Sequence, residues 1–251
     1  DYFRQTGLGK LADEGFRRIG TNVVAPGTPL GGLTEGAAAE MGLAPATPVA
    51  AALIDAHAGG VGTLCVSAAR QSADVGKRLA YIFGTSACSM ASAPDPVFVP
   101  GVWGPYYTAM IPGIWLLEGG QSAAGAALDR LVALHPDAAM LEAEAAGQGR
   151  SLLAHVAAHA ETLGPSLSAT ILAARDMVVV PEFNGNRSPF ADPGARAVIS
   201  GLSFERGLTS LAALYLAGLS GIGYGLRQLL VRLRERGIEI SSIVASGGAA
   251  R

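Results

Sequence analysis

The stretch VAAALIDAHAGG, residues 49–60, decides the fold, because Asp55 joins an apolar segment to a run of small residues. Residues 49–54 have the length and composition of one buried strand, and residues 56–68 predict a helix. A carboxylate at such a junction is held on rigid backbone, and its small neighbours leave it open to a ligand. Asp55 is therefore a candidate general base, and the alternative is an N-cap of the helix that follows.

Further strand candidates occur along the chain, and each is followed by a turn of small residues. They are residues 79–83, 114–117, 177–180, 197–200 and 241–245. Helical patterns lie at residues 34–42, 120–134, 137–147, 150–163 and 207–236. The segment 92–113 is rich in proline and aromatic residues and predicts an irregular excursion or a hairpin. Strands mixed with helices of this length predict a layered α/β fold.

Composition limits the classes of function. The chain has 251 residues and a formal charge of −2, which allows one large domain or two small ones. Lys and Arg are scattered, so no basic patch predicts nucleic-acid binding. Cys65 and Cys88 have neither metal nor disulfide spacing and predict free thiols in a reducing cytoplasm. The chain shows no signal peptide and begins at Asp1 rather than Met, so we expect a segment of a longer protein.

Residues 208–226 carry no charge and are long enough to span a membrane. The same stretch contains serine, threonine and four glycines, Gly218, Gly221, Gly223 and Gly225, and it continues into a basic amphipathic end. Small residues allow close packing against other elements, so we expect a buried core helix, with a membrane span as the alternative. A polar stretch at residues 68–78 marks a plausible change of domain.

Two glycine turns follow strand candidates. The turn GTS at residues 84–86 offers backbone N–H groups and a hydroxyl that suit a phosphate, although a plain hairpin is the alternative. Gly247 and Gly248 follow SSIVAS and would let a flat ring or a phosphate approach the backbone. Both turns are therefore candidate nucleotide contacts.

A third motif, EGGQS at residues 118–122, follows a strand candidate and is predicted to open a helix whose amides receive an anion or a nucleotide sugar. Glu118 at its start suits a polyol hydroxyl, and the alternative is a favourable charge at a helix N-terminus. The string PEFNGNRSPFADP, residues 181–193, predicts a rigid polar loop around Arg187, or else a stiff surface connection. His155 and His159 lack a third ligand, which favours a solvent-facing or capping pair over a metal site.

Five of these motifs, taken in order, resemble the FGGY family of carbohydrate kinases. They are LIDAHAGGVG, the GTS turn, LEGGQSAAG, NGNRSPFADP and SGGAAR. The combination of NGNRSP with DAHAGG resembles the ribulokinase-like branch most. The resemblance covers nearly the whole chain.

The resemblance implies two actin-like ATPase (ribonuclease H-like) domains with a cleft between them. Residues 1–75 would end the N-terminal, sugar-binding domain, and residues 76–251 would form most of the C-terminal, nucleotide-binding domain, truncated at its end. It implies a cytoplasmic enzyme that uses ATP and Mg²⁺ to phosphorylate a sugar, such as the ketopentose ribulose. A homodimer is compatible with the family, and neither nucleic acid nor membrane is expected as a partner.

The resemblance also implies roles for single residues. Asp55 corresponds to the catalytic base, which also contacts the sugar, and Glu118 corresponds to a ketose contact. The nucleotide contacts would be Gly84, Thr85, Gly120, Gly247 and Gly248. The family's first phosphate loop, an Asp-x-Gly-Thr turn, is absent, so we expect the chain by itself to be inactive. The alternative is a non-catalytic actin-like module that binds nucleotide.

Overall fold

The computed structural model describes residues 2–68 and 75–248. It divides the chain into two compact units, Asp1–Ile54 and Asp55–Arg251. The polar stretch at 68–78 lies in part outside the described residues, which leave out 69–74. The family's domain boundary at 75/76 stays a prediction, although the compact units separate between Ile54 and Asp55.

The first unit contains short elements only. They are α1 (Tyr2–Gln5), α2 (Gly9–Asp13), β1 (Pro29–Gly32), α3 (Glu35–Met41) and β2 (Pro48–Ala50). The prediction of one buried strand over 49–54 is wrong, because β2 ends at Ala50 and its residues are exposed. β2 pairs with β1 alone, in a two-stranded antiparallel hairpin, and so small a sheet has no second layer to bury it.

The second unit is built on a five-stranded sheet with the order β5-β6-β4-β3-β9. Its strands are β3 (Arg78–Phe83), β4 (Ala87–Ala93), β5 (Trp103–Tyr107), β6 (Trp115–Gln121) and β9 (Ser242–Ser246). β3 and β9 are parallel, and the other pairs are antiparallel. The predicted excursion over 92–113 contains β5, which forms a hairpin with β6.

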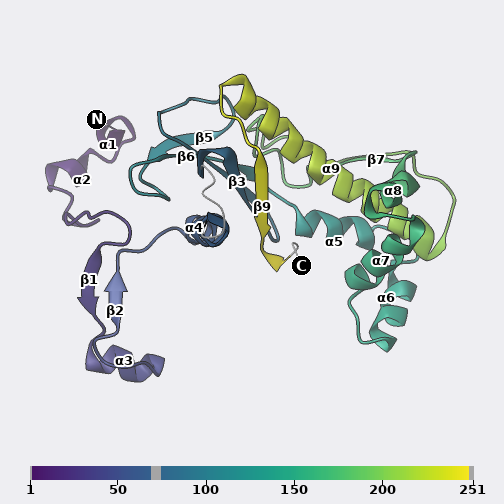
Figure 1. Cartoon of the computed structure of the whole chain (residues 1–251), viewed down its shortest axis with the longest axis horizontal. Helices are drawn as coiled ribbons and strands as arrows, with labels where there is room; N and C mark the ends of the chain where they lie inside the picture. The colour runs from purple at the N-terminus through teal and green to yellow at the C-terminus, as the bar shows by residue number, and fades with distance from the viewer. Residues whose placement is uncertain (1, 69–74, 249–251) are drawn as a thin grey trace. The chain divides into compact units, whose positions relative to one another are not determined.

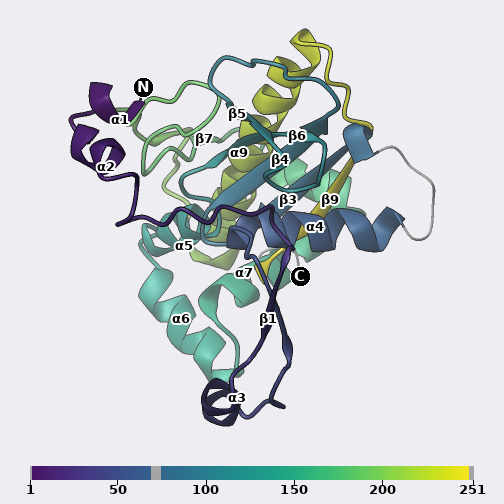
Figure 2. The same cartoon turned by 90° about the vertical axis from the view of Figure 1, so that its left-hand side faces the viewer.

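One helix covers each face of this sheet (Figures 1 and 2). α4 (Asp55–Ala68) packs on one face, where Leu64 joins a buried cluster with Met90 and Leu116. α9 (Gly207–Glu235) packs on the other face, where Leu229 and Leu233 join a second cluster. The result is an α/β/α sandwich, which confirms the predicted α/β class.

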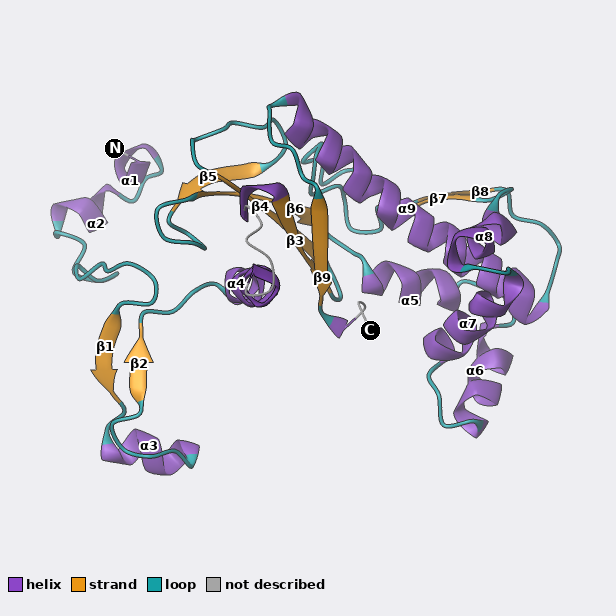
Figure 3. Cartoon of the chain, in the orientation of Figure 1, coloured by secondary structure: helices purple, strands orange, loops and turns teal. Residues whose placement is uncertain are grey.

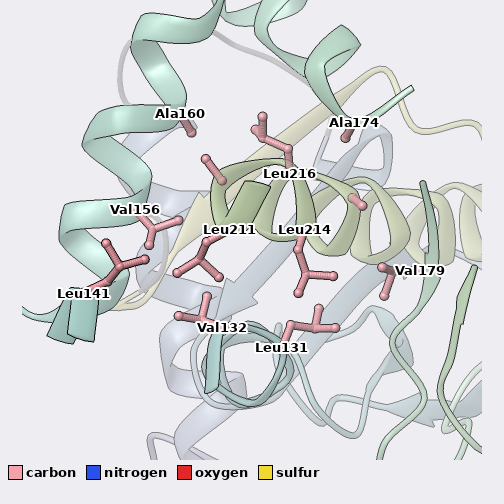
Figure 4. Packing of buried hydrophobic residues seen from close by; sticks show 12 residues of the cluster. Leu131, Val132, Leu141, Val156, Ala160, Ala174, Val179, Leu211, Leu214 and Leu216 are labelled. Atoms are coloured by element: carbon pink, nitrogen blue, oxygen red, sulfur yellow. The ribbon is translucent and has the colours of Figure 1, made fainter. Parts of the chain in front are cut away.

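The first half of α9 carries a helical layer. It consists of α5 (Gly125–Ala133), α6 (Ala138–Gly147), α7 (Leu152–Ala160) and α8 (Leu167–Thr170), with two 3₁₀ turns at Glu161–Leu163 and Ile171–Ala174. The antiparallel pair of β7 (Val178–Val180) and β8 (Val198–Ser200) packs beside them. Figure 3 shows these helices gathered at one end of α9 and the main sheet at the other. Leu131, Val156 and Leu211 form the centre of their common core (Figure 4).

Among the described residues, α9 is the one helix whose length and hydropathy would allow it to cross a membrane. The structure uses it as the central core helix, as the small residues predict. A methyl group added at Gly221 would lie 2.2 Å from the Val179 carbonyl oxygen, so glycine is required for this close packing.

An ion pair fixes the start of α9. Arg206 donates to the Asp137 carboxylate, and the Gly207 N–H donates to Asp137 Oδ2 at 2.7 Å. The Arg206 hydrogen bond, helped by the Gly207 N–H, lowers the pKa of Asp137 to about 2. Asp137 therefore supplies the negative charge that a helix N-terminus favours.

Candidate functional site

The structure brings two of the predicted glycine turns together. Because β3 and β9 are parallel neighbours, with Ile82 opposite Ser246, the turns that follow them lie at the same end of the sheet. Gly247 has a φ of +103°, and a methyl group on it would lie 2.4 Å from the Phe83 carbonyl oxygen. The turn at Gly247 is therefore packed directly on the backbone that leads into the Gly84 turn.

The start of α5 is docked on the Gly84 turn. The Gly125 N–H donates to the Gly84 carbonyl oxygen, and the Ala124 N–H donates to the Thr85 carbonyl oxygen, both at 2.9 Å. A methyl group on Gly125 would lie 2.7 Å from the Gly84 oxygen, so a larger residue would separate helix and turn. Sequence reasoning missed Gly125, and the run of small residues before an amphipathic helix was the available signal.

The predicted opening of that helix at residues 118–122 is wrong. Glu118 and Gly120 lie inside β6, which continues to Gln121, and α5 begins only at Gly125. Cys88 of β4 pairs with Gly120, and a methyl group on Gly120 would lie 2.2 Å from the Ala87 oxygen. The strand persists because its neighbour β4 runs to the GTS turn, and Gly120 has a structural reason to be glycine.

A charged cluster lies on the α4 face of the sheet. Its centre is Glu118, whose side chain is 13% exposed. Arg187 Nη2 donates to Glu118 Oε1 at 2.8 Å, and His57 Nε2 lies 3.2 Å from Glu118 Oε2. His57 is 3% exposed, and its Nδ1 lies 3.2 Å from the carbonyl oxygen of Ala109. Sequence reasoning included Glu118 but missed its partners His57 and Arg187 as members of one site.

Arg187 is held by neighbours on both sides. Its guanidinium lies over the Trp103 ring, 4.4 Å from the centroid, and its Nη1 lies 3.6 Å from Cys88 Sγ. The loop that carries it is fixed by Asn186, which donates to Glu182 at 2.7 Å and accepts from the Phe190 N–H at 2.9 Å. Burial raises the pKa of Glu182. The segment 181–193 is therefore an anchored loop, as its sequence predicts.

Asp55 is the first residue of α4, and it is exposed. It lies two residues before His57, on the helix that supplies the charged cluster. Farther along α4, Thr63 Oγ1 lies 3.0 Å from Ser246 Oγ, next to the turn at Gly247. The rise of an α-helix puts Asp55 about 12 Å from Thr63 along the helix axis. One helix thus connects the candidate base, the Glu118 cluster and the β9 end of the sheet.

Metal ligands are sparse. Within residues 2–68 and 75–248, no group of three or more His, Cys, Asp or Glu side chains could hold a metal ion. His155 is buried, whereas His159 Nε2 bonds Thr209 Oγ1 at 3.0 Å, so the pair does not act together. The described residues therefore do not fit a Mg²⁺ ion held by the protein alone.

Comparison with known proteins places this architecture. The model of the FGGY family of carbohydrate kinases, C-terminal domain, matches residues 79–251. An FGGY carbohydrate kinase domain-containing protein from Xenopus laevis is 41% identical over 256 residues, which cover 100% of this chain and 46% of that protein. A D-ribulokinase from Saccharomyces cerevisiae is 34% identical over 272 residues and is covered to 38% of its length.

Solved structures show the same fold. The crystal structure of a xylulose kinase from Rhodospirillum rubrum superposes with a TM-score of 0.63 at 24% sequence identity, over 91% of this chain and 40% of that one. The chain spans about half the length of the curated relatives it matches, 46% for the Xenopus laevis protein. Its sandwich, with helices on both faces of a mixed sheet, is the actin-like fold of these sugar kinases. The chain belongs to the FGGY family of carbohydrate kinases.

Proposed function

We propose that the full-length protein containing this chain transfers the γ-phosphoryl group of ATP to a sugar hydroxyl, and that the sugar is a ketopentose such as ribulose. The observation that carries this proposal is the pair of glycine turns at Gly84 and Gly247, packed together at the end of β3 and β9. The similarity to a D-ribulokinase supports the choice of a ketopentose.

Phosphoryl transfer asks the protein mainly to orient the reactants and to stabilise charge. Asp55 accepts the proton of the attacking sugar hydroxyl, whose oxygen forms a bond to the γ-phosphorus. The bond from that phosphorus to the β,γ-bridging oxygen breaks, and ADP leaves with the electron pair. The exposure of Asp55 at the start of α4 supports this role, because a base must reach its substrate.

The nucleotide contacts fall on the two turns. The Gly84 N–H donates to the Ser86 oxygen at 2.9 Å, so the exposed Thr85 is the better donor to a phosphate. Gly84 and Gly248 have no close neighbour among the described residues that excludes a methyl group, which leaves room for a ligand. Gly247 shapes the adenosine turn. Gly120 remains a nucleotide contact by resemblance only.

We assign the sugar contact to Glu118. Its carboxylate lies beside His57, which follows Asp55 by two residues on α4. Arg187 Nε and Ser188 Oγ are buried and have no hydrogen-bond partner among the described residues. Buried polar atoms without partners are costly, so a ligand or water is expected to bond them. Mg²⁺ would enter with ATP, since such ions are commonly held by substrate phosphates. A cytoplasmic location and a homodimer remain predictions.

The test uses the full-length protein with ATP, Mg²⁺ and a panel of ketopentoses. We expect ADP release that depends on one sugar, and none from the 251-residue chain alone. Asp55→Asn should lower kcat by at least about a hundredfold, because general-base catalysis contributes that much. Calorimetric titration with ADP should give the wild-type affinity for this variant. Loss of ADP binding instead would show that Asp55 is structural.

The alternative is a non-catalytic nucleotide-binding module. It predicts ADP binding without sugar-dependent turnover in the full-length protein. The same two measurements therefore separate the candidates, and Asp129→Asn, on α5, is a matched control that should change neither.

A further inference from the structure

Both carboxylate oxygens of Glu118 have a side-chain partner. Arg187 Nη2 donates to Oε1 at 2.8 Å, and His57 Nε2 faces Oε2 at 3.2 Å. The three side chains are mostly shielded from solvent, with 13% exposure for Glu118, 20% for Arg187 and 4% for His57. A carboxylate held at both oxygens has little freedom to rotate, so its remaining lone pairs point in fixed directions.

The contacts of His57 fix the direction of its ring. The carbonyl oxygen of Ala109 can only accept, so Nδ1 donates to it at 3.2 Å. This bond holds one edge of the ring, and Nε2 at the other edge lies 3.2 Å from Glu118 Oε2. Glu118 is therefore held between a ring fixed by the backbone and the guanidinium of Arg187.

The three side chains come from three elements: α4 supplies His57, β6 supplies Glu118, and the loop 181–193 supplies Arg187. Loss of either partner would leave one oxygen of Glu118 without its contact, and the carboxylate could then rotate.

We propose that His57 and Arg187 are positioning residues of the sugar site, which fix the direction of Glu118 and so set the affinity for the sugar. This inference rests on the proposed function, in which Glu118 accepts from a sugar hydroxyl. Neither residue need touch the sugar. Arg187 is itself prevented from moving by Trp103, over whose ring it lies, so the alignment extends from the sheet to the loop.

The kinetic test uses the full-length protein and measures KM for the sugar, KM for ATP and kcat. His57→Ala removes the contact to Glu118 Oε2, and Arg187→Lys removes the planar donor to Oε1. Each should raise KM for the sugar about tenfold, with KM for ATP and kcat within about twofold. His57→Gln keeps an N–H donor and should restore part of the sugar affinity that His57→Ala loses.

Two variants control for general damage. His155→Gln replaces a histidine that is also buried, on α7, and Arg196→Lys replaces an exposed arginine just after the same loop. Both should keep the wild-type KM for the sugar. The inference is overturned if Arg187→Lys or His57→Ala keeps the wild-type KM for the sugar, or if His57→Gln is no better than His57→Ala.

A spectroscopic measurement separates this inference from the proposed function. In ¹⁵N NMR of the full-length protein, Glu118→Gln should shift the His57 Nε2 resonance and leave the His155 resonances unchanged. An unchanged His57 resonance would refute the positioning role even in an active kinase. Conversely, a shifted His57 resonance in a protein without sugar-dependent turnover would refute the kinase assignment and leave the contact between His57 and Glu118 in place.

Discussion

The two faces of β6 put neighbouring residues to opposite uses. On the α4 face, Glu118 is enclosed by His57 and Arg187, which come from other elements. On the α9 face, Gln121 accepts from the Tyr81 hydroxyl at 2.9 Å and donates to the Ile222 carbonyl oxygen at 2.9 Å. Burial raises the pKa of Tyr81 to about 12, so this second network stays neutral. One strand thus separates a face with a shielded carboxylate and its ion pair from a face that holds the core together.

If the α9 face holds the core together, substitutions on that face should lower the free energy of unfolding the most. Leu229 is 3% exposed and packs against Gly119, the residue next to Glu118. Leu229→Ala should lower the free energy of unfolding by about 3 kcal/mol, because it removes buried methyl groups and leaves a cavity. Urea unfolding followed by circular dichroism measures this. Met140→Ala, at an exposed position on α6, is the control and should change little. A loss below about 1 kcal/mol would contradict the role of α9 as the core helix.

The neutral network should give a smaller effect of the same kind. Gln121→Leu leaves the Tyr81 hydroxyl and the Ile222 carbonyl without their partner, so it should cost about 2 kcal/mol. Adding Tyr81→Phe removes the hydroxyl that has lost its partner and should recover part of this loss. The same unfolding experiment reports both values. If the double variant is no more stable than Gln121→Leu, the two side chains are not coupled.

The ion pair at the start of α9 provides the weakest and most specific test, because it is charged but, among the described residues, shares no hydrogen bond or ion pair with the Glu118 cluster. The folded-state pKa of Asp137 is lowered to about 2 from an ordinary value of 3.8, since Arg206 and the Gly207 N–H favour the carboxylate. Its stabilising contribution is therefore complete above about pH 4 and is lost as pH falls toward about 2. The wild type should exceed Asp137→Asn in stability near neutral pH, and the difference should shrink in acid.

That difference is measured as the shift in thermal unfolding midpoint at several pH values. The sugar KM of Asp137→Asn should equal the wild-type value, in contrast to Arg187→Lys. A change in the sugar KM of Asp137→Asn would show that the charge at the start of α9 affects the sugar site. The two charged sites would then not be independent.

The local sequence pattern predicted the α/β class, the long helix over 207–235 and most strand positions. It failed where the pairing of strands decides where a strand ends. The stretch 49–54 is apolar, yet β2 ends at Ala50, because only one neighbouring strand is there to pair with it. EGGQS has the composition of a turn, yet β4 extends β6 to Gln121.

The site shows the same limit. Glu118 was recognisable from its motif, whereas His57 and Arg187 are 61 and 69 positions away from it along the chain. No local signal reports a contact of that separation. Gly125 was missed because its requirement for glycine comes from the Gly84 carbonyl oxygen, which only the folded chain brings near.

The bond between Thr63 and Ser246 has a mechanical consequence. Because α4 is fastened to the sheet of the second unit, Asp55 and Thr85 belong to one body, and the division of the chain falls just before Asp55. The separation of these two side chains is therefore set inside the second unit and does not depend on where the first unit lies.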